Sequence, residues 1–335
     1  MRIGVNPEKN RETKLIHKRH RIIIPFWIPN VEDEYFKNQP KVLHLCLKSI
    51  IETVDFEQTN ITLINNNSCT EASKIAEEFV NKGLIDKYVI RNENRGKLEN
   101  ILAEARASYE DFITISDSDF LYFPGWENAV FNILDTFPFT GMVSCYPAAH
   151  LAYFYNSNFI LHRFKSGKII SDEDIDMFER GHGHPINEGL YSSIKLKQKY
   201  SWREKHYYIE KNNQIAILGA VHALATFRKE VAQKFNTKPV NYVFKNGYEV
   251  EYIDFSIERN GYLRVSTPTL FAYHLGNTIP EDLQIIYEKR KNNWNNDKQT
   301  KIWKQTRTKK RKSFHRLIFP FTNILFRGLR KFKLI

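Results

Sequence analysis

Apolar runs and amphipathic segments alternate along the first half of the chain. "RIIIPF" at 21–26 and "ITLI" at 61–64 are short and rich in β-branched residues, whereas the apolar residues between 43 and 54 recur at intervals of three or four positions. The short runs predict buried strands, and the longer period predicts an amphipathic helix.

The same order repeats further along the chain. "YVI" at 88–90, "FITIS" at 112–116 and "GMVSCY" at 141–146 predict strands, which are separated by helical segments at about 97–107 and after Pro124. Alternation of strands and helices is typical of a mostly parallel sheet with helices on both faces. We therefore expect an α/β fold with a mostly parallel central sheet.

The second half of the chain is less regular. Residues 148–213 are rich in Tyr, His, Asn and acidic residues and have weak periodicity, as is typical of long loops that shape a site. The pattern at 215–235 predicts a glycine turn that leads into an amphipathic helix. A helix that ends at Gly261 and a strand that ends at His274 are expected to follow.

Composition favours a globular protein of a reducing compartment. Hydrophobic residues make up 42% of the chain and aromatic residues 14%, which is enough for a sizeable core. Cys46, Cys69 and Cys145 are odd in number and widely spaced, so we expect neither a disulfide framework nor a zinc site, and we expect a cytoplasmic location. We expect no signal peptide, and no segment approaches the roughly 20 apolar residues that a membrane-spanning helix needs.

The net charge of +12 comes from the C-terminal segment alone. Residues 301–335 contain 12 Lys and Arg and no Asp or Glu, so the remainder holds 38 basic residues (50 less these 12) and 38 acidic residues. The body of the protein therefore lacks the basic excess of a nucleic-acid-binding domain, and no nucleic-acid partner is expected.

Asp117 and Asp119 follow the predicted strand at 112–116 and are separated by one residue. Side chains alternate in an extended chain, so both carboxylates point to the same side and repel each other unless a cation is present. Hard divalent ions bind carboxylate oxygens and often take substrate phosphates as further ligands. The pair therefore predicts a metal-bound diphosphate, with two solvated turn residues as the alternative.

Polar residues follow three of the predicted strands at one edge of the sheet. In sheets of this kind, ligands bind beyond the carboxyl ends of the strands. The residues expected to converge there are Asn65, Asn66, Asn94, Asp117 and Asp119.

Five segments occur in the order that one enzyme family shows. They are "RIIIPFWIPN" at 21–30, "LINNNS" at 63–68, "NENRGKLENIL" at 92–102, "DSDFLYFPGW" at 117–126 and "FAYHLGN" at 271–277. Over about residues 20 to 278, the chain thus resembles family 2 of the nucleotide-sugar-dependent glycosyltransferases, which have the type A (GT-A) fold.

The resemblance implies an activity, a cofactor and partners. A family 2 enzyme moves a sugar, with inversion and with bound Mn²⁺ or Mg²⁺, from a nucleotide-sugar donor to a glycan or lipid-linked acceptor in surface polysaccharide synthesis. By this resemblance Asp117, Asp119 and His274 would hold the metal. The donor pocket would be lined by Pro25, Asn65, Asn66, Asn94, Arg95, Gly96, Asp117 and Ser118.

The catalytic base is expected late in the chain, because inverting transfer needs a carboxylate that removes the proton of the acceptor hydroxyl. The family places this base in a Glu-Asp pair, and here Tyr252 occupies the position of the aspartate. Glu251 and Asp254 flank it at a spacing that predicts one helical face, and we favour Asp254. Glu173-Asp174 resembles the pair but comes out of the family's order.

The chain is expected to have three parts. Residues 1–20 would be an N-terminal extension and 21–285 a GT-A domain, with its nucleotide-sugar-binding half at 21–147 and its acceptor and catalytic half at 148–285. Residues 286–335 would be a basic, partly apolar tail.

The tail joins a basic cluster that begins at Lys309 to an apolar run from Leu317 to Phe326. Such a segment suits peripheral binding to the anionic inner face of a membrane. The alternative is a helix that packs its apolar residues against the body.

Two other functions compete with glycosyl transfer. An Asp-x-Asp phosphatase or phosphotransferase usually has its motif after the first strand and carries Thr or Val where this chain has Leu121. A non-catalytic nucleotide-sugar-binding protein is the other alternative, because the segment around the expected base is irregular.

Overall fold

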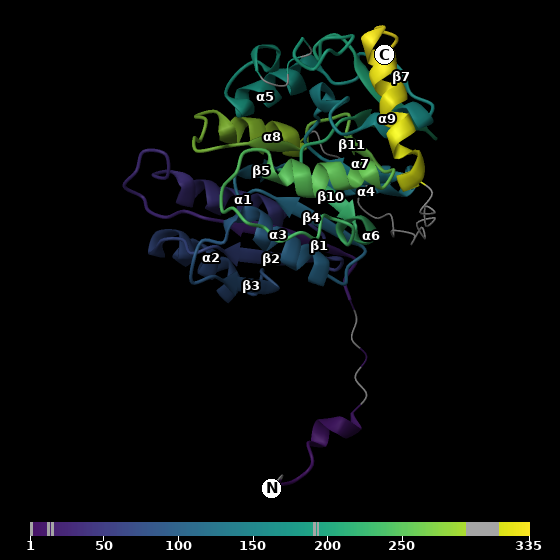
Figure 1. Ribbon diagram of the computed structural model, residues 1–335. Helices are drawn as coiled ribbons and strands as arrows, with labels where there is room; N and C mark the ends of the chain where they lie inside the picture. The colour runs from purple at the N-terminus through teal and green to yellow at the C-terminus, as the bar shows by residue number, and fades with distance from the viewer. Residues whose placement is uncertain (1–2, 12–13, 15–16, 190–191, 193, 293–314) are drawn as a thin grey trace.

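The computed structural model describes residues 3–11, 14, 17–189, 192, 194–292 and 315–335. These residues form a mixed α/β body around a ten-stranded sheet (Figure 1). The short helix η1 (Pro7–Asn10) lies away from this body, at the end of the chain that precedes the first strand (Figure 1). The expected fold class is confirmed.

The strands of the large sheet are, in spatial order, β3 (Lys87–Ile90), β2 (Thr59–Asn65), β1 (His20–Phe26), β4 (Phe112–Ser116), β10 (Leu224–Arg228), β6 (Thr140–Ser144), β11 (Leu263–Ser266), β9 (Gln214–Leu218), β8 (His206–Lys211) and β7 (Lys165–Gly167). β12 (Ala272–His274) and β5 (Phe120–Tyr122) form a separate antiparallel pair.

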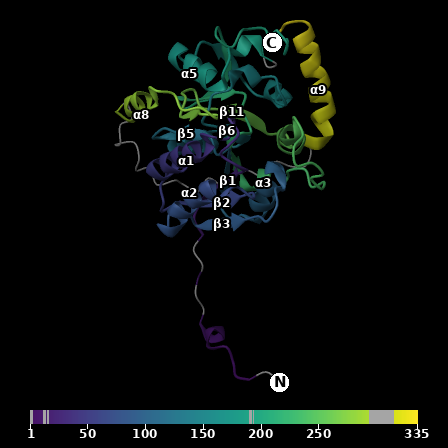
Figure 2. The same ribbon diagram turned by 90° about the vertical axis from the view of Figure 1, so that its left-hand side faces the viewer.

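The directions of the strands show which of their ends lie together at one edge of the sheet. β1 runs parallel to β2 and β4, and β2 runs parallel to β3, so the carboxyl ends of these four strands lie at one edge. β10 is inserted antiparallel between β4 and β6, and β11 is again parallel to β6. Figure 2 shows β1, β2 and β3 in one half of the body and α5 in the other.

The helices are α1 (Gln39–Thr53), α2 (Thr70–Asn81), α3 (Gly96–Ala107), α4 (Trp126–Thr136), α5 (Asp172–His182), α6 (Lys229–Ala232), α7 (Phe255–Arg259), α8 (Leu283–Asn292) and α9 (His315–Lys331). Shorter turns are η2 (Ala149–Leu151), η3 (Ser157–Leu161), η4 (Ile186–Glu188) and the π-helical turn η5 (Val250–Asp254).

The core has two layers because successive side chains of a strand point to opposite faces. Ile22 and Ile24 of β1 pack in the layer that α1, α2 and α4 cover. Ile23 packs in the layer that α3, α6 and α7 cover. All three side chains are fully buried, which explains why "RIIIPF" has no polar alternation.

The prediction of a helix after the glycine turn at Gly219 is wrong for most of the segment. Leu224–Arg228 is a strand, β10, between β4 and β6, and the helix that follows covers only Lys229–Ala232. A strand that is buried on both faces lacks the alternation that identifies strands, so its pattern resembles that of a buried helix.

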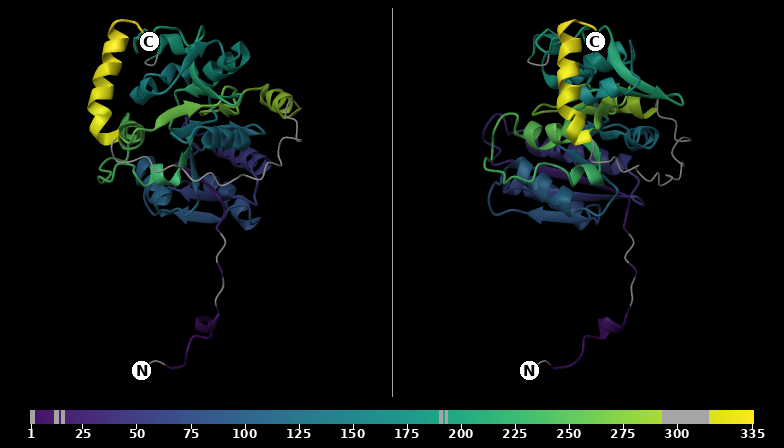
Figure 3. Two further views of the ribbon diagram at one scale, coloured as in Figure 1. Left: turned by 90° about the vertical axis from the view of Figure 1, so that its right-hand side faces the viewer. Right: turned by 45° about the vertical axis from the view of Figure 1, so that its right-hand side comes forward.

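The expected tail boundary at residue 286 falls inside α8. The side chains of α8 contact the body: Tyr287 donates a hydrogen bond to Glu52 (3.0 Å), and Arg290 pairs with the buried Asp174. α9 lies along the outside of the body (Figure 3) and packs Phe326 against Tyr153. Both helices therefore contact the body, whereas the cluster from Lys309 to Phe314 lies outside the described residues.

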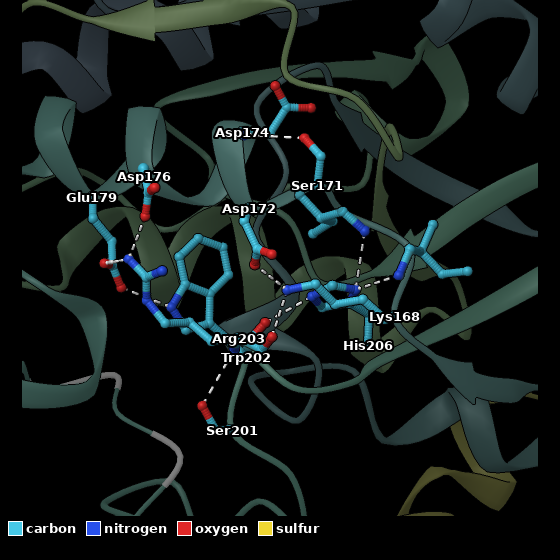
Figure 4. A network of polar contacts seen from close by, with 12 residues as sticks. Lys168, Ser171, Asp172, Asp174, Asp176, Glu179, Ser201, Trp202, Arg203 and His206 are labelled. Atoms are coloured by element: carbon cyan, nitrogen blue, oxygen red, sulfur yellow. Dashed lines mark hydrogen bonds and ion pairs between the residues drawn. The ribbon is translucent and has the colours of Figure 1, made fainter.

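A polar network fixes the start of α5 to the loop before β8 (Figure 4). The backbone N–H groups of Ile169 and Ile170 donate to His206 Nδ1 at 3.0 and 3.1 Å, and His206 Nε2 donates to the carbonyl of Trp202 at 2.7 Å. His206 is therefore neutral, with its proton on Nε2. Burial lowers the pKa of His206 to about 4.

The lowered pKa of His206 predicts that the stability of the protein depends on pH. The unfolded chain binds the proton near pH 6.5 and the folded chain only near pH 4, so stability is fully present above pH 6.5 and falls as the pH drops towards 4. His206 should contribute a loss of about 3 kcal/mol in the free energy of unfolding across this range. Urea unfolding of the wild type and of His206→Asn, whose amide oxygen can replace Nδ1 as acceptor, measures the difference.

The exposed His17 provides the matched control, because its side chain is solvated in both states. His17→Gln should leave the slope of stability against pH unchanged. An equal slope in the wild type and in His206→Asn would contradict the assigned role of His206.

Candidate active site

A cavity of about 420 Å³ opens at the edge where β1, β2 and β4 end. Its lining residues are Pro25, Phe26, Trp27, Tyr35, Phe36, Gln39, Asn66, Asn94, Lys97, Asp117, Ser118, Asp119 and Phe244. Ligands of doubly wound sheets bind at such an edge. The structure thus brings together most of the donor-binding residues that the sequence predicts.

Asp117 and Asp119 lie in the loop that follows β4. The backbone N–H of Asp117 donates to the carbonyl of Ala223 at 2.8 Å, and its carboxylate forms an ion pair with Lys97. Burial raises the pKa of the Asp117 carboxyl; the Lys97 ammonium opposes this shift, and the Asp119 carboxylate reinforces it. His222 is also close enough to lower the pKa of Asp117.

The second carboxylate faces a histidine from β12. His274 Nε2 lies 3.3 Å from Asp119 Oδ2, and His274 Nδ1 lies 2.8 Å from the carbonyl oxygen of Gly181. A carbonyl and a carboxylate only accept, so without a metal both Nδ1 and Nε2 donate; when Nε2 loses its proton, its lone pair can bind a metal. Burial lowers the pKa of His274, but Asp119 outweighs it and the net shift is upward.

These groups fit a divalent cation. Asp119 Oδ1 is buried and has no hydrogen-bond partner within the described part of the chain, as expected of an oxygen that awaits a ligand. Among the described residues, no three His, Cys, Asp or Glu side chains form a complete metal site. Asp119 and His274 therefore supply an incomplete ligand set, which a donor diphosphate can complete.

The asparagines have different roles. Asn65 is buried and uses its amide within the fold, since Nδ2 donates to Ser73 (2.8 Å) and Tyr88 (3.1 Å) and Oδ1 accepts from the backbone of Ser68 (2.8 Å). It is not among the residues that line the cavity, so its predicted role in donor binding is not supported. Asn66 does line the cavity.

Asn66 and Asn94 also shape the loop before α3. Asn66 Nδ2 donates to Asn94 Oδ1 at 2.7 Å, and the backbone N–H groups of Arg95 and Gly96 donate to Asn66 and Asn94, each at 2.9 Å. Gly96 has a φ of +76°, and an added Cβ would lie 2.5 Å from the carbonyl oxygen of Val243. Glycine is therefore required where this loop contacts the segment before α7.

Lys97, not Arg95, provides the cation of the cavity. The Arg95 side chain lies at the surface and pairs with Glu93 and Glu99, so the structure does not place it among the donor-binding groups. Burial opposes the charged form of Lys97, but Asp117 and other carboxylates outweigh burial and raise its pKa. Lys97 is not among the residues that the sequence predicts for the site, although it follows Gly96 in the first turn of α3.

Aromatic side chains form one wall of the cavity. Trp27 contacts Phe36 (ring centroids 5.7 Å apart) and Phe244 (5.4 Å), and Tyr35 packs against Phe36. Tyr35 and Phe244 are 61% and 70% exposed, so apolar surface remains available to a ligand. Trp27 could have been found from its place after the first strand, whereas nothing in the local sequence places Phe244 here.

The candidates for the catalytic base are not equivalent. Glu251 is exposed and Asp254 is fully buried, so the prediction that they share one helical face is wrong. They belong to the π-helical turn η5, in which residues three apart diverge more than in an α-helix. Tyr252 is buried, and its hydroxyl donates a hydrogen bond to the carbonyl of Pro239 (2.7 Å). Asp174 forms an ion pair with Arg290.

Three solved structures show limited similarity to this chain. A mannosyltransferase from Pyrobaculum calidifontis, in complex with GDP-Man and Mn²⁺, is 15% identical, with 82% of this chain and 61% of that chain covered and a TM-score of 0.43. Residues 1–349 of TarS from S. aureus are 10% identical, with 76% and 58% covered and a TM-score of 0.42. The same TarS fragment in complex with UDP-GlcNAc is 14% identical, with 38% and 33% covered and a TM-score of 0.31.

The chain thus spans less than two thirds of each of these proteins. No curated protein matches the chain significantly. The profile of Glycosyl transferase family 2 matches residues 35–235, which is more than half of the chain and includes β2, β4 and the loop with Asp117 and Asp119. The chain therefore belongs to glycosyl transferase family 2.

Proposed function

We propose that this glycosyltransferase is metal-dependent and inverting, and that it moves a sugar from a nucleotide-sugar donor to a glycan or lipid-linked acceptor in surface polysaccharide synthesis. One observation carries the proposal: a single cavity combines an aromatic wall with Lys97, Asp117 and Asp119. Family membership makes the chain a glycosyltransferase, so the phosphatase and the non-catalytic binding protein are set aside.

The cavity matches the parts of a nucleotide sugar. Trp27 and Phe244 offer flat apolar surface to the base, and the amides of Asn66 and Asn94 lie nearby for polar atoms of the nucleoside. Lys97 supplies a positive charge for the diphosphate. A divalent ion held by Asp119 and His274, with Asp117 beside it, would neutralise the charge that develops on the departing diphosphate.

Lys97→Gln should weaken binding of the donor. A hydrogen bond to a charged group contributes roughly 1.5–3 kcal/mol, so the dissociation constant of UDP or GDP should rise about 10- to 100-fold. Arg95→Gln is the matched control, because its side chain points to Glu93 and Glu99 and its loss should change affinity less than about twofold. Isothermal titration with both nucleotides in the presence of Mn²⁺ measures the change, and a larger effect of Arg95→Gln would refute the assignment.

Asp119→Ala should abolish Mn²⁺-dependent binding of the nucleotide. Its melting temperature without metal should stay within a few degrees of the wild type, because the loss of the contact with His274 is offset by the loss of the repulsion between Asp119 and Asp117. Thermal shift with and without Mn²⁺, and Mn²⁺ titration followed by electron paramagnetic resonance, provide the readouts. Asp176→Ala removes an exposed carboxylate and should bind Mn²⁺ and nucleotide as the wild type does. Retained Mn²⁺ binding in Asp119→Ala would contradict the assignment of Asp119 as a metal ligand.

α9 supports a peripheral association with an anionic membrane. Its inner face packs Phe326 against the body, while its outer face exposes apolar side chains: Leu317, Phe321, Ile324 and Leu325. No helix in the described part of the chain is long and apolar enough to cross a bilayer. We place the enzyme at the cytoplasmic face, where lipid-linked acceptors and anionic headgroups meet.

Positive charge lies beside this face. A cavity of about 830 Å³ between α9 and the segment around Ile194 is lined by basic residues and no acidic ones: Lys195, Lys197, Arg327, Arg330, Lys331 and Lys333. Apolar side chains that enter the headgroup boundary and cations that attract anionic lipid act together at a membrane surface.

The variant Leu317→Ser/Phe321→Ser/Ile324→Ser should lose most of its sedimentation with vesicles of phosphatidylserine and phosphatidylcholine, while its melting temperature stays within a few degrees, because all three side chains are exposed. Ile90→Ser/Ile285→Ser removes exposed apolar side chains elsewhere and should sediment as the wild type does. Undiminished sedimentation of the triple variant would exclude α9 as the contact.

A further inference from the structure

His222 lies beside the carboxylate loop, in the segment between β9 and β10. β10 pairs antiparallel with β4 from Leu224 opposite Ser116, and the pairing continues with the hydrogen bond from Asp117 N to Ala223 O at 2.8 Å. His222 is the next residue, so the sheet register places it beside the loop that carries Asp117, close enough for its charge to act on the Asp117 carboxyl. Its side chain is 26% exposed.

One nitrogen of His222 contacts a buried carboxylate. Asp254 Oδ2 lies 2.9 Å from His222 Nδ1, and the Asp254 side chain is completely buried. Because a carboxylate only accepts, Nδ1 donates its proton to Asp254. The neutral ring therefore has its lone pair on Nε2.

Asp254 is held from its other side by a buried arginine. Arg264 Nη2 lies 3.1 Å from Asp254 Oδ1, and the Arg264 guanidinium also donates to the carbonyls of Phe154 and Ala220. Arg264 is fully buried as well, so its charge and that of Asp254 compensate each other without water. This pairing fixes the orientation of the carboxylate and, through it, of the His222 ring.

The other base candidates do not meet the requirement for reach. A general base must contact the hydroxyl whose proton it removes. Asp254 has no exposed surface, with Oδ2 against His222 and Oδ1 3.1 Å from Arg264 Nη2, whereas Glu251 is exposed. His222 alone among these three combines partial exposure, a fixed tautomer and contact with a buried carboxylate.

We propose that His222 is the catalytic base of the transfer and that Asp254 is a positioning residue. His222 Nε2 takes the proton of the acceptor hydroxyl as that oxygen forms its bond to the anomeric carbon, while the bond from the anomeric carbon to the diphosphate breaks and its electron pair leaves with the diphosphate. The Asp254 carboxylate stabilises the imidazolium that results. This proposal rests on the proposed function.

The arrangement follows the logic of other His-Asp pairs in enzymes, in which a buried carboxylate sets the tautomer of a histidine that handles the proton. It also accounts for Tyr252 at the position where the family places its aspartate: the base is supplied from the sheet edge instead of from the late helix.

The test uses the full chain with Mn²⁺ and a panel of UDP-GlcNAc, UDP-Glc, UDP-Gal and GDP-Man. Binding is measured by thermal shift, and turnover as release of nucleoside diphosphate with water or short oligosaccharides as acceptors. His222→Gln and His222→Ala should bind donor within about twofold of the wild type but turn over at least about 100-fold more slowly, as for loss of a general base. Added imidazole should restore part of the activity of His222→Ala.

Asp254→Asn should keep donor binding and lower turnover at least about 10-fold, without rescue by imidazole, because His222 is then present in the wrong tautomer. Glu251→Gln is the control and should turn over as the wild type does. If His222→Gln keeps at least half of the turnover, or if Asp254→Asn is inactive while His222→Gln is active, the base is not His222.

A measurement without substrate guards against variants that fold poorly. Nitrogen-15 spectra of histidine-labelled protein, with the His222 signal assigned from its loss in His222→Gln, should show the Nδ1-protonated tautomer in the wild type. An Nε2-protonated ring overturns the dyad. A wild type that neither binds nor consumes any sugar nucleotide of the panel refutes the proposed function, and the dyad falls with it, whereas turnover that is indifferent to His222 refutes the dyad alone.

Discussion

The desolvation of two carboxylates at the end of β4 is the constraint around which this site is built. Asp117 and Asp119 follow a fully buried strand and each has one buried carboxylate oxygen, so water can disperse only part of their charge. Lys97 forms an ion pair with Asp117, and His274 contacts Asp119. Lys97 comes from the first turn of α3 and His274 from the end of β12, so the two partners reach the carboxylates from different elements.

The same loop links the two halves of the protein. The backbone of Asp117 pairs with Ala223, which fixes the strand of the second half, β10, against β4 of the first half. His222, one residue away, reaches Asp254 and through it Arg264 on β11. The carboxylate loop and the His222–Asp254 pair are therefore joined by contiguous backbone and side-chain contacts.

Charged groups in the second half are buried in pairs or in hydrogen-bonded positions. Glu258 Oε1 accepts from the backbone of Ser157 at 2.8 Å, and burial raises the pKa of this carboxyl. Asp174 accepts from the backbone of Leu270 at 3.1 Å and pairs with Arg290. Loops without regular periodicity can be held rigid in this way, because an unpaired buried charge is far more costly than a paired one.

The sequence by itself determined the alternating strands and helices of the first half and the shared edge at which Asn66, Asp117 and Asp119 meet, because hydrophobic periodicity reports burial within one segment. Only the tertiary structure decided that 224–228 is a strand, since a segment buried on both faces shows no alternation. It also decided which neighbour in the loop faces the cavity, Lys97 instead of Arg95, and that His222 contacts Asp254, 32 positions away. Those choices depend on which partners packing brings within hydrogen-bond distance, and local sequence carries no record of such partners.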